Sequence, residues 1–176
     1  MAEIKGRLDD PACRLLTLVG PGGSGKTRLA LEAAAAQLDD FEHGVFFVSL
    51  APLRSVESIV PTVARAVGFS FYGAEVEPRQ QLLDYLRRKR MLLILDNFEH
   101  LLEGVALVTQ VLESAPEVKI LVTSRARLNV QAEHLFAVLG MYYPDRDAVQ
   151  EAARYSAVKL FLDCARRARS GFELTA

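Results

Sequence analysis

Short apolar runs alternate along the chain with segments in which apolar residues recur every three or four positions. A continuous apolar run is typical of a strand that is buried on both faces, as in a parallel sheet. Strands are therefore predicted at 15–19, 44–50, 91–96 and 118–124, and 134–139 is a candidate for a fifth.

The segments between these runs have the period of a helix. Helices are predicted at 26–38, 61–68, 79–89, 101–112 and 158–165. Pro61 suits a first helical turn, Gly68 suits a helix end, and Ser156 suits the N-cap of the last helix. This alternation predicts an α/β domain with a five-stranded, mostly parallel sheet and helices on both faces, a three-layer arrangement.

The first predicted strand is followed by GPGGSGKT at residues 20–27, which fits the phosphate-binding loop of P-loop NTPases. Glycines let the backbone curl around an anion, and the following helix adds the positive end of its dipole. Lys26 is expected to reach the β- and γ-phosphates, and Thr27 to hold Mg²⁺. A glycine-rich turn that matches by accident is the alternative, but the strand before and the helix after favour the loop. The expected nucleotide-binding residues are Gly20, Pro21, Gly22, Gly23, Ser24, Gly25, Lys26, Thr27 and Arg28.

A second signal is LLILDNFEH, in which Asp96 ends a predicted buried strand. A buried carboxylate is costly unless it is paired or bound to a metal. Because ligands of such sheets bind beyond the carboxyl ends of the strands, Asp96 is expected to lie near the loop and to hold Mg²⁺ with Thr27. The alternative is an aspartate that only caps a helix or a turn.

Glu99 is a candidate catalytic base that would orient or deprotonate the attacking water. It could equally be a solvated glutamate in a first helical turn, where the helix dipole favours an acid. Asn97 can orient a water but cannot accept its proton.

A third signal is TSRAR, at the end of the fourth predicted strand. Arg125, at this end of the strand, is a candidate to contact the γ-phosphate and to stabilise the charge that develops on it. The alternative is a surface arginine, and by composition alone Arg127 has an equal claim to the role.

Charge and apolar content narrow the range of partners. The formal net charge of −1 gives no overall attraction to nucleic acid or to a membrane surface. The basic cluster at 87–90 ends a predicted helix, where cations suit the dipole, and no aromatic residues interleave with it. No apolar run approaches the ~20 residues that span a bilayer. We therefore expect no direct nucleic-acid binding by this domain and no membrane contact.

The two cysteines, Cys13 and Cys164, lie far apart and form no ligand pattern. Without a signal-like start to the chain, they are expected to be buried thiols of a cytoplasmic protein. The three histidines, His43, His100 and His134, do not have the spacing of metal ligands.

With these residues in place, the chain resembles the NB-ARC type of STAND signal-transduction ATPases, in particular the branch found in bacterial LuxR- and SARP-like transcriptional regulators. The matching stretches are RLLTLVGPGGSGKTRLALEAA, GVFFVSLAPL, LLILDNFEHLL, ILVTSRARL and AVKLFLDCARRARSGFEL, in this order over nearly the whole chain. The resemblance implies an ATP/ADP switch in which the strand ending at Ser124 lies between the loop strand and the strand ending at Asp96. It also gives Arg125 the role of sensing the γ-phosphate.

The chain departs from the family's pattern in several places. Family members often have a second acid directly after the metal aspartate, where this chain has Asn97. The upstream hhGRE and downstream GLPL motifs are not found, 1–10 looks like the helix after hhGRE, and 136–145 matches the family's linker only loosely. The resemblance thus implies one nucleotide-binding domain, 1–176, from a larger multidomain regulator, with 140–176 beginning the region toward a GLPL module. Effector and sensor domains would lie outside this chain. A nucleotide-dependent homo-oligomer of the full-length protein is compatible with the resemblance.

Three functions compete on this evidence. The first is a Mg²⁺-dependent ATPase that hydrolyses ATP slowly to reset a switch. The second is a nucleotide-binding module that is locked by ADP without useful turnover, which Asn97 favours. The third is a small-molecule or nucleoside kinase, which would need a lid, and the sequence shows no arginine-rich lid segment.

Overall fold

The structure is a computed structural model that describes residues 2–73, 75–140, 154–169 and 171–172. The chain divides into two compact units, Met1–Val138 and Leu139–Ala176, and each is described by itself.

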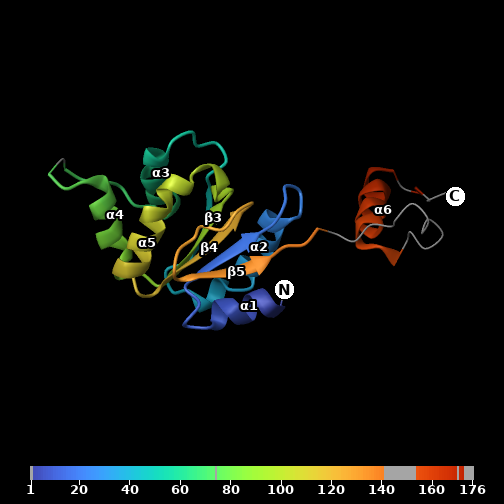
Figure 1. The fold of residues 1–176 in the computed structure, drawn as a ribbon, viewed down its shortest axis with the longest axis horizontal. Coiled ribbons are helices and arrows are strands. Elements are labelled where there is room, and N and C mark those ends of the chain that lie inside the picture. Colours follow the sequence, from blue (N-terminus) through green and yellow to red (C-terminus); the bar gives the residue numbers. More distant parts are fainter. Residues whose placement is uncertain (1, 74, 141–153, 170, 173–176) are drawn as a thin grey trace. The chain divides into compact units, whose positions relative to one another are not determined.

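The first unit is built on a five-stranded sheet in the order β2-β3-β4-β1-β5 (Figure 1). Every neighbouring pair is parallel. The strands are β1 (Leu15–Val19), β2 (Val45–Ser49), β3 (Met91–Asp96), β4 (Val118–Ser124) and β5 (Glu133–Ala137). The predicted α/β fold class is confirmed, and β4 lies between β1 and β3 as the resemblance implies.

Parallel pairing in register brings the carboxyl ends of the strands together. Val19, the last residue of β1, pairs with Ser124 at the end of β4. Leu95 in β3 pairs with Val122 in β4, so Asp96 lies beside Thr123. The segments that follow β1, β3 and β4 therefore leave the sheet at one end, although they are far apart in the sequence.

Helices cover both faces of this sheet (Figure 1). They are α1 (Ala2–Asp9), α2 (Lys26–Ala35), α3 (Ile59–Ala66), α4 (Pro78–Leu86) and α5 (Val105–Ser114). The sequence signals for the ends of α3 match: Pro61 lies in its first turn, and Gly68 follows it with a φ of 71°, a conformation that glycine adopts without strain.

Alternate strand residues divide the core into two layers, as the pleat of a strand requires. Leu16 and Ile94 belong to the cluster that includes α1 and α2. Leu15 and Leu93 belong to the larger cluster with α3, α4 and α5. Because both faces are covered, β1, β3 and β4 read as continuous apolar runs, which is why the sequence pattern predicted them correctly.

The second unit contains α6 (Ser156–Ala168). Ser156 was expected to cap this helix, but it is the first helical residue, and Tyr155 occupies the N-cap position. Cys13 is buried as expected, whereas Cys164 is exposed. The expectation for Cys164 was wrong because α6 buries only Leu162. Most of the predicted linker at 136–145, and residues 141–153 of the region 140–176, lie outside the described residues.

In the part of the chain that the structure describes, no helix is both long enough and apolar enough to span a bilayer.

Candidate functional site

The loop between β1 and α2 owes its shape to glycines. Gly23 and Gly25 have φ values of 76° and 89°, in the left-handed region where other residues are strained. Gly20 is constrained in another way, because a Cβ added there would collide with the carbonyl oxygen of Val138, directly after β5. The chain therefore curls tightly, and α2 begins at Lys26.

This loop presents backbone N–H groups that have no partner. Among the described residues, no acceptor bonds the amides of Gly22, Gly23 or Gly25. The N–H groups in the first turn of α2 also lack helical partners, as they do in any helix. Unpaired donors beside a helix N-terminus make a site that suits an anion, so the residues present fit a phosphate group.

The Lys26 side chain folds back over the same loop. Its Nζ donates hydrogen bonds to the carbonyl oxygens of Gly20 and Pro21, each at 2.8 Å. Both acceptors are neutral, so the positive charge of Lys26 has no anionic partner among the described residues. A charged group held this way can exchange a carbonyl for a phosphate oxygen at little cost.

Asp96 is the centre of a hydroxyl network at the end of β3. Its side chain is largely buried, with the residue 8% exposed. Its Oδ1 accepts hydrogen bonds from Thr27 Oγ1 and from Thr123 Oγ1, each at 2.7 Å. Thr123 Oγ1 in turn accepts from the backbone N–H of Asn97 at 2.9 Å. The loop, β3 and β4 are thus joined at one carboxylate.

The predicted metal residues, Thr27 and Asp96, are therefore in direct contact. A hydroxyl oxygen and a carboxylate oxygen are ligands that suit Mg²⁺. The described residues bring no three His, Cys, Asp or Glu side chains together as a metal site. A divalent cation held here would take its other ligands from phosphate oxygens and water, as Mg²⁺ commonly does.

Glu99 and Arg125 form an ion pair across the same end of the sheet. Arg125 Nε lies 3.0 Å from Glu99 Oε1, with 66% of the arginine side chain exposed but only 17% of the glutamate side chain. Glu99 Oε2 is buried, and no described residue donates a hydrogen bond to it. The guanidinium also lies over the loop, with Nη2 3.4 Å from where a Cβ on Gly22 would be.

These residues line one cavity of about 370 Å³, which is large enough for a phosphate chain but small for a whole nucleotide. Its walls are Gly22, Gly23, Gly25, Lys26, Thr27, Arg28, Asn97, Glu99, Thr123 and Arg125. Arg28 also pairs with Glu32 at 3.0 Å on the exposed face of α2. Arg127, which had an equal claim by composition, does not line the cavity.

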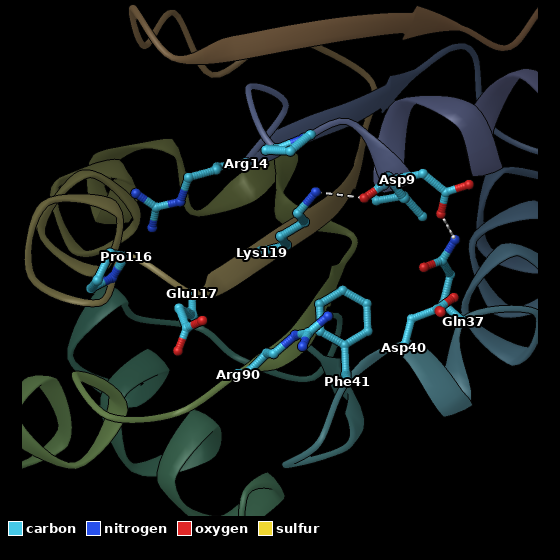
Figure 2. Close-up of a pocket in the computed structure, with 11 residues that line it drawn as sticks. Asp9, Arg14, Gln37, Asp40, Phe41, Arg90, Pro116, Glu117 and Lys119 are labelled. Atoms are coloured by element: carbon cyan, nitrogen blue, oxygen red, sulfur yellow. Dashed lines mark hydrogen bonds between the residues drawn. The ribbon is translucent and has the colours of Figure 1, made fainter.

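A larger cavity, of about 480 Å³, lies at the opposite end of the strands (Figure 2). Two of its cations are already engaged. Arg14 donates to carbonyl oxygens at the end of α5, at 2.7 and 2.6 Å, and Lys119 donates to those of Leu8 and Asp10, at 2.5 and 2.7 Å. Burial lowers the pKa of both basic groups. These contacts tie α1 and α5 to the sheet, so this wall has a structural role.

Sequence reasoning missed two features of the site. Thr123 was seen only as part of the strand end TSRAR, and its role as the bridge between Asp96 and Asn97 was not anticipated. Asn97 has a φ of 68°, and this left-handed turn redirects the chain after β3. Asparagine tolerates this conformation better than most residues, which is the one sequence signal that could have indicated it.

Comparison with known proteins gives a consistent picture. The family model described as "AAA domain" matches residues 10–141. A Mycobacterium tuberculosis protein named "Putative HTH-type transcriptional regulator Rv0890c" is 40% identical over 166 residues, which are 92% of this chain but 17% of that protein. The uncharacterized M. tuberculosis protein Rv0894 is 33% identical over 93% of this chain and 39% of its own length. The chain thus spans a minor part of these relatives.

Solved structures share the fold at low sequence identity. Cdc6p from Pyrobaculum aerophilum has a TM-score of 0.59 at 16% identity, over 94% of this chain and 49% of its own. A structure of Drosophila ORC bound to AT-rich DNA and Cdc6 has a TM-score of 0.53 at 12% identity, over 98% of this chain and 68% of its own. Identities this low carry the fold alone.

Proposed function

The chain belongs to the AAA domain family, and from that premise we propose that it is the ATP-binding switch domain of a larger regulator, which hydrolyses ATP slowly with Mg²⁺. The observation that carries this proposal is the group of unpaired loop amides beside Lys26 and Thr27 at one cavity, together with the hydrogen bond from Thr27 to Asp96. Within the AAA domains we assign the chain to the NB-ARC type of STAND ATPases, on the residues that resemble that type.

In this proposal the loop 20–27 and Arg28 bind the phosphates of ATP or ADP. The amides of the loop and the N-terminus of α2 accept the anion, and Lys26 moves from the carbonyls of Gly20 and Pro21 to the β- and γ-phosphates. Thr27 and Asp96 would hold Mg²⁺, which would supply positive charge against the negative charge that develops on the phosphates.

The catalytic residues in this proposal are Lys26, Glu99 and Arg125. Glu99 is the one carboxylate among the described residues that line the loop cavity, and no described residue donates a hydrogen bond to its Oε2, so it is the candidate to accept a proton from the attacking water. Arg125 reaches over the loop at Gly22 and is the candidate for the γ-phosphate.

A second candidate function has one observation in its favour. The residue directly after Asp96 is Asn97, which has no proton-accepting group, and Glu99 is engaged by Arg125. A nucleotide-binding module that holds ADP without useful turnover would not need a catalytic base, either directly after Asp96 or at Glu99. Single-turnover measurement of ATP hydrolysis separates the two, because only the first function releases phosphate.

The partners proposed for this domain are ATP and the other domains of the same protein. The relative named as an HTH-type transcriptional regulator is several times longer than this chain, which supports a transcriptional output through domains outside it. We propose a cytoplasmic location and nucleotide-dependent homo-oligomers of the full-length protein, without direct nucleic-acid binding or membrane contact by this domain.

The binding function is tested by isothermal calorimetry with ATP and Mg²⁺. Lys26→Ala removes the only ammonium group of the cavity and is expected to abolish measurable binding, since charge-assisted contacts to phosphate are the strong ones. Lys5→Ala, on the exposed side of α1, is the matched control and should bind as the unchanged chain does. ATP binding by Lys26→Ala at unchanged affinity would remove the loop from the proposal.

A further inference from the structure

The Glu99–Arg125 pair has a feature that neither residue shows alone. Glu99 Oε1 holds Arg125 Nε at 3.0 Å, while the outer part of the same guanidinium lies over Gly22 of the phosphate loop. One cation therefore lies within reach of two anionic partners: the Glu99 carboxylate and a phosphate bound in the loop.

Exposure makes this pair easy to exchange. The arginine is the exposed partner, with 66% of its side chain exposed against 17% for Glu99, so solvent screens the pair at the arginine, and pairs at exposed sites change an equilibrium by a factor of roughly five or less. A phosphate group offers several acceptor oxygens and more than one negative charge, so it can take the guanidinium from a single carboxylate.

The direction of the bound phosphate chain decides which phosphate lies near Arg125 and can compete with Glu99 for its guanidinium. Thr27 Oγ1 and Asp96 Oδ1 meet beside the ends of β3 and β4, and a Mg²⁺ ion held there would supply positive charge to the far end of the phosphate chain. Glu99 and Arg125 follow these same two strands. The third phosphate, which ADP lacks, is therefore the one directed toward Arg125.

We propose that Glu99 and the γ-phosphate compete for Arg125, so that the ion pair acts as a lock that distinguishes ATP from ADP. With ADP, Arg125 stays on Glu99, and the carboxylate remains engaged. With ATP, Arg125 moves to the γ-phosphate, and Glu99 is released to face the attacking water. This inference rests on the proposed function, because it assumes that the loop binds the nucleotide.

The lock couples the arrival of the γ-phosphate at Arg125 to the release of the Glu99 carboxylate, two events that would be independent if the base and the sensor did not contact each other. The carboxylate becomes free only when the third phosphate has arrived, so the site is completed by its own substrate. No covalent step is involved, and the charge balance is simple: Arg125 exchanges one anionic partner for another.

A double-mutant cycle tests the competition by equilibrium binding. The dissociation constants of a non-hydrolysable ATP analogue and of ADP, each with Mg²⁺, are measured for the unchanged chain, Glu99→Gln, Arg125→Ala and the double variant. Arg127→Ala is the matched control, because Arg127 is exposed and does not line the cavity.

The lock predicts a specific pattern. Glu99→Gln should tighten the ATP analogue by roughly two- to fivefold and leave ADP unchanged, since it removes the competitor of the γ-phosphate only. Arg125→Ala should weaken the analogue about tenfold and leave ADP unchanged. In the Arg125→Ala background, Glu99→Gln should no longer tighten the analogue. Arg127→Ala should change neither ligand.

Two results would overturn the lock. If Glu99→Gln tightens the ATP analogue equally with and without Arg125, then Glu99 only repels the phosphate. If ADP responds as the analogue does, then the pair does not distinguish the third phosphate. In both cases the unchanged chain still binds nucleotide and Lys26→Ala still does not, so the proposed function stands. If the unchanged chain binds neither ligand, the proposed function itself fails, and the lock fails with it.

Discussion

At the scale of single residues, Gly20 is the loop position that leaves the least room for a side chain. Its missing Cβ makes space for the Val138 carbonyl, so Gly20→Ala should lower the free energy of unfolding by about 1–3 kcal/mol and weaken nucleotide binding. Gly6→Ala is the control, because a Cβ on Gly6 meets nothing within 4 Å and alanine favours the helix. Chemical denaturation compares the two variants, and equal stability would show that the loop can move away from Val138.

Asp96 gives a second prediction at this scale. Asp96→Asn keeps an oxygen that can accept the hydroxyls of Thr27 and Thr123 but loses the negative charge that would hold Mg²⁺. We expect residual nucleotide binding that no longer depends on Mg²⁺, measured by titration with and without a chelator. Asp84→Asn, at an exposed aspartate, is the control, and its nucleotide binding should still depend on Mg²⁺. If nucleotide binding by Asp96→Asn also still depends on Mg²⁺, the metal is held by other residues.

The loop motif and the buried aspartate could be predicted from the sequence because their chemistry is local. Lys26 and Thr27 lie in a motif that follows a recognisable strand, Asp96 ends another, and the carboxyl ends of parallel strands lie at one edge of the sheet. The Glu99–Arg125 pair could not be predicted in the same way. It joins two segments 26 positions apart, and its geometry depends on the left-handed turn at Asn97 and on the path of the chain after β4.

At the scale of elements, Arg14 connects the start of β1 to the end of α5. Its guanidinium donates to carbonyl oxygens at the end of that helix and to Val118 at the start of β4. The Leu112 carbonyl has no helical partner, because the residue four positions on is Pro116, which has no N–H, so losing the Arg14 donor leaves that carbonyl unsatisfied. Arg14→Met, which keeps much of the side-chain volume, should lower the free energy of unfolding by about 1–3 kcal/mol.

Arg87→Met is the matched control for this prediction. Arg87 lies directly after α4, and its side chain makes an exposed ion pair with Asp84 at 3.4 Å and no other ion pair among the described residues, so Arg87→Met should change the free energy of unfolding by no more than about 0.5 kcal/mol. Denaturant titration compares the two, and a cost for Arg14→Met no larger than for Arg87→Met would contradict the structural role of Arg14.

The sequence predicted strands correctly where a single physical cause, burial on both faces of the sheet, produced the apolar pattern. The central strands are buried on both faces, so their apolar runs were unambiguous. The edge strand β5 is half exposed, and its predicted bounds of 134–139 differ from Glu133–Ala137. The cap of α6 was misplaced by one residue because serine suits both the N-cap and the first turn.

At the scale of the whole molecule, the chain contains the phosphate end of a nucleotide site within its first unit, Met1–Val138. The three strand ends that form the site come from residues 19–27, 96–99 and 123–125 of the chain, and the sheet order places them together. The fold class followed from strand and helix alternation alone. The STAND assignment and the partner domains depend on resemblance, and they remain proposals.

The last prediction concerns the rate of turnover. Asn97 offers no proton acceptor beside Asp96, and Glu99 becomes available only when Arg125 leaves it, so hydrolysis should be well below the ~10 s⁻¹ of a median enzyme. Lys26, Mg²⁺ and Arg125 still stabilise the transition state, since phosphoryl transfer depends mostly on positioning and charge. If Glu99 is the base, Glu99→Gln should slow single-turnover hydrolysis at saturating ATP by about 10²-fold without weakening ATP binding. Glu103→Gln, an exposed glutamate four positions along, should hydrolyse ATP at the unchanged rate. An unchanged rate in Glu99→Gln would favour the nucleotide-binding module, because the only available carboxylate of the cavity would then take no part in the chemistry.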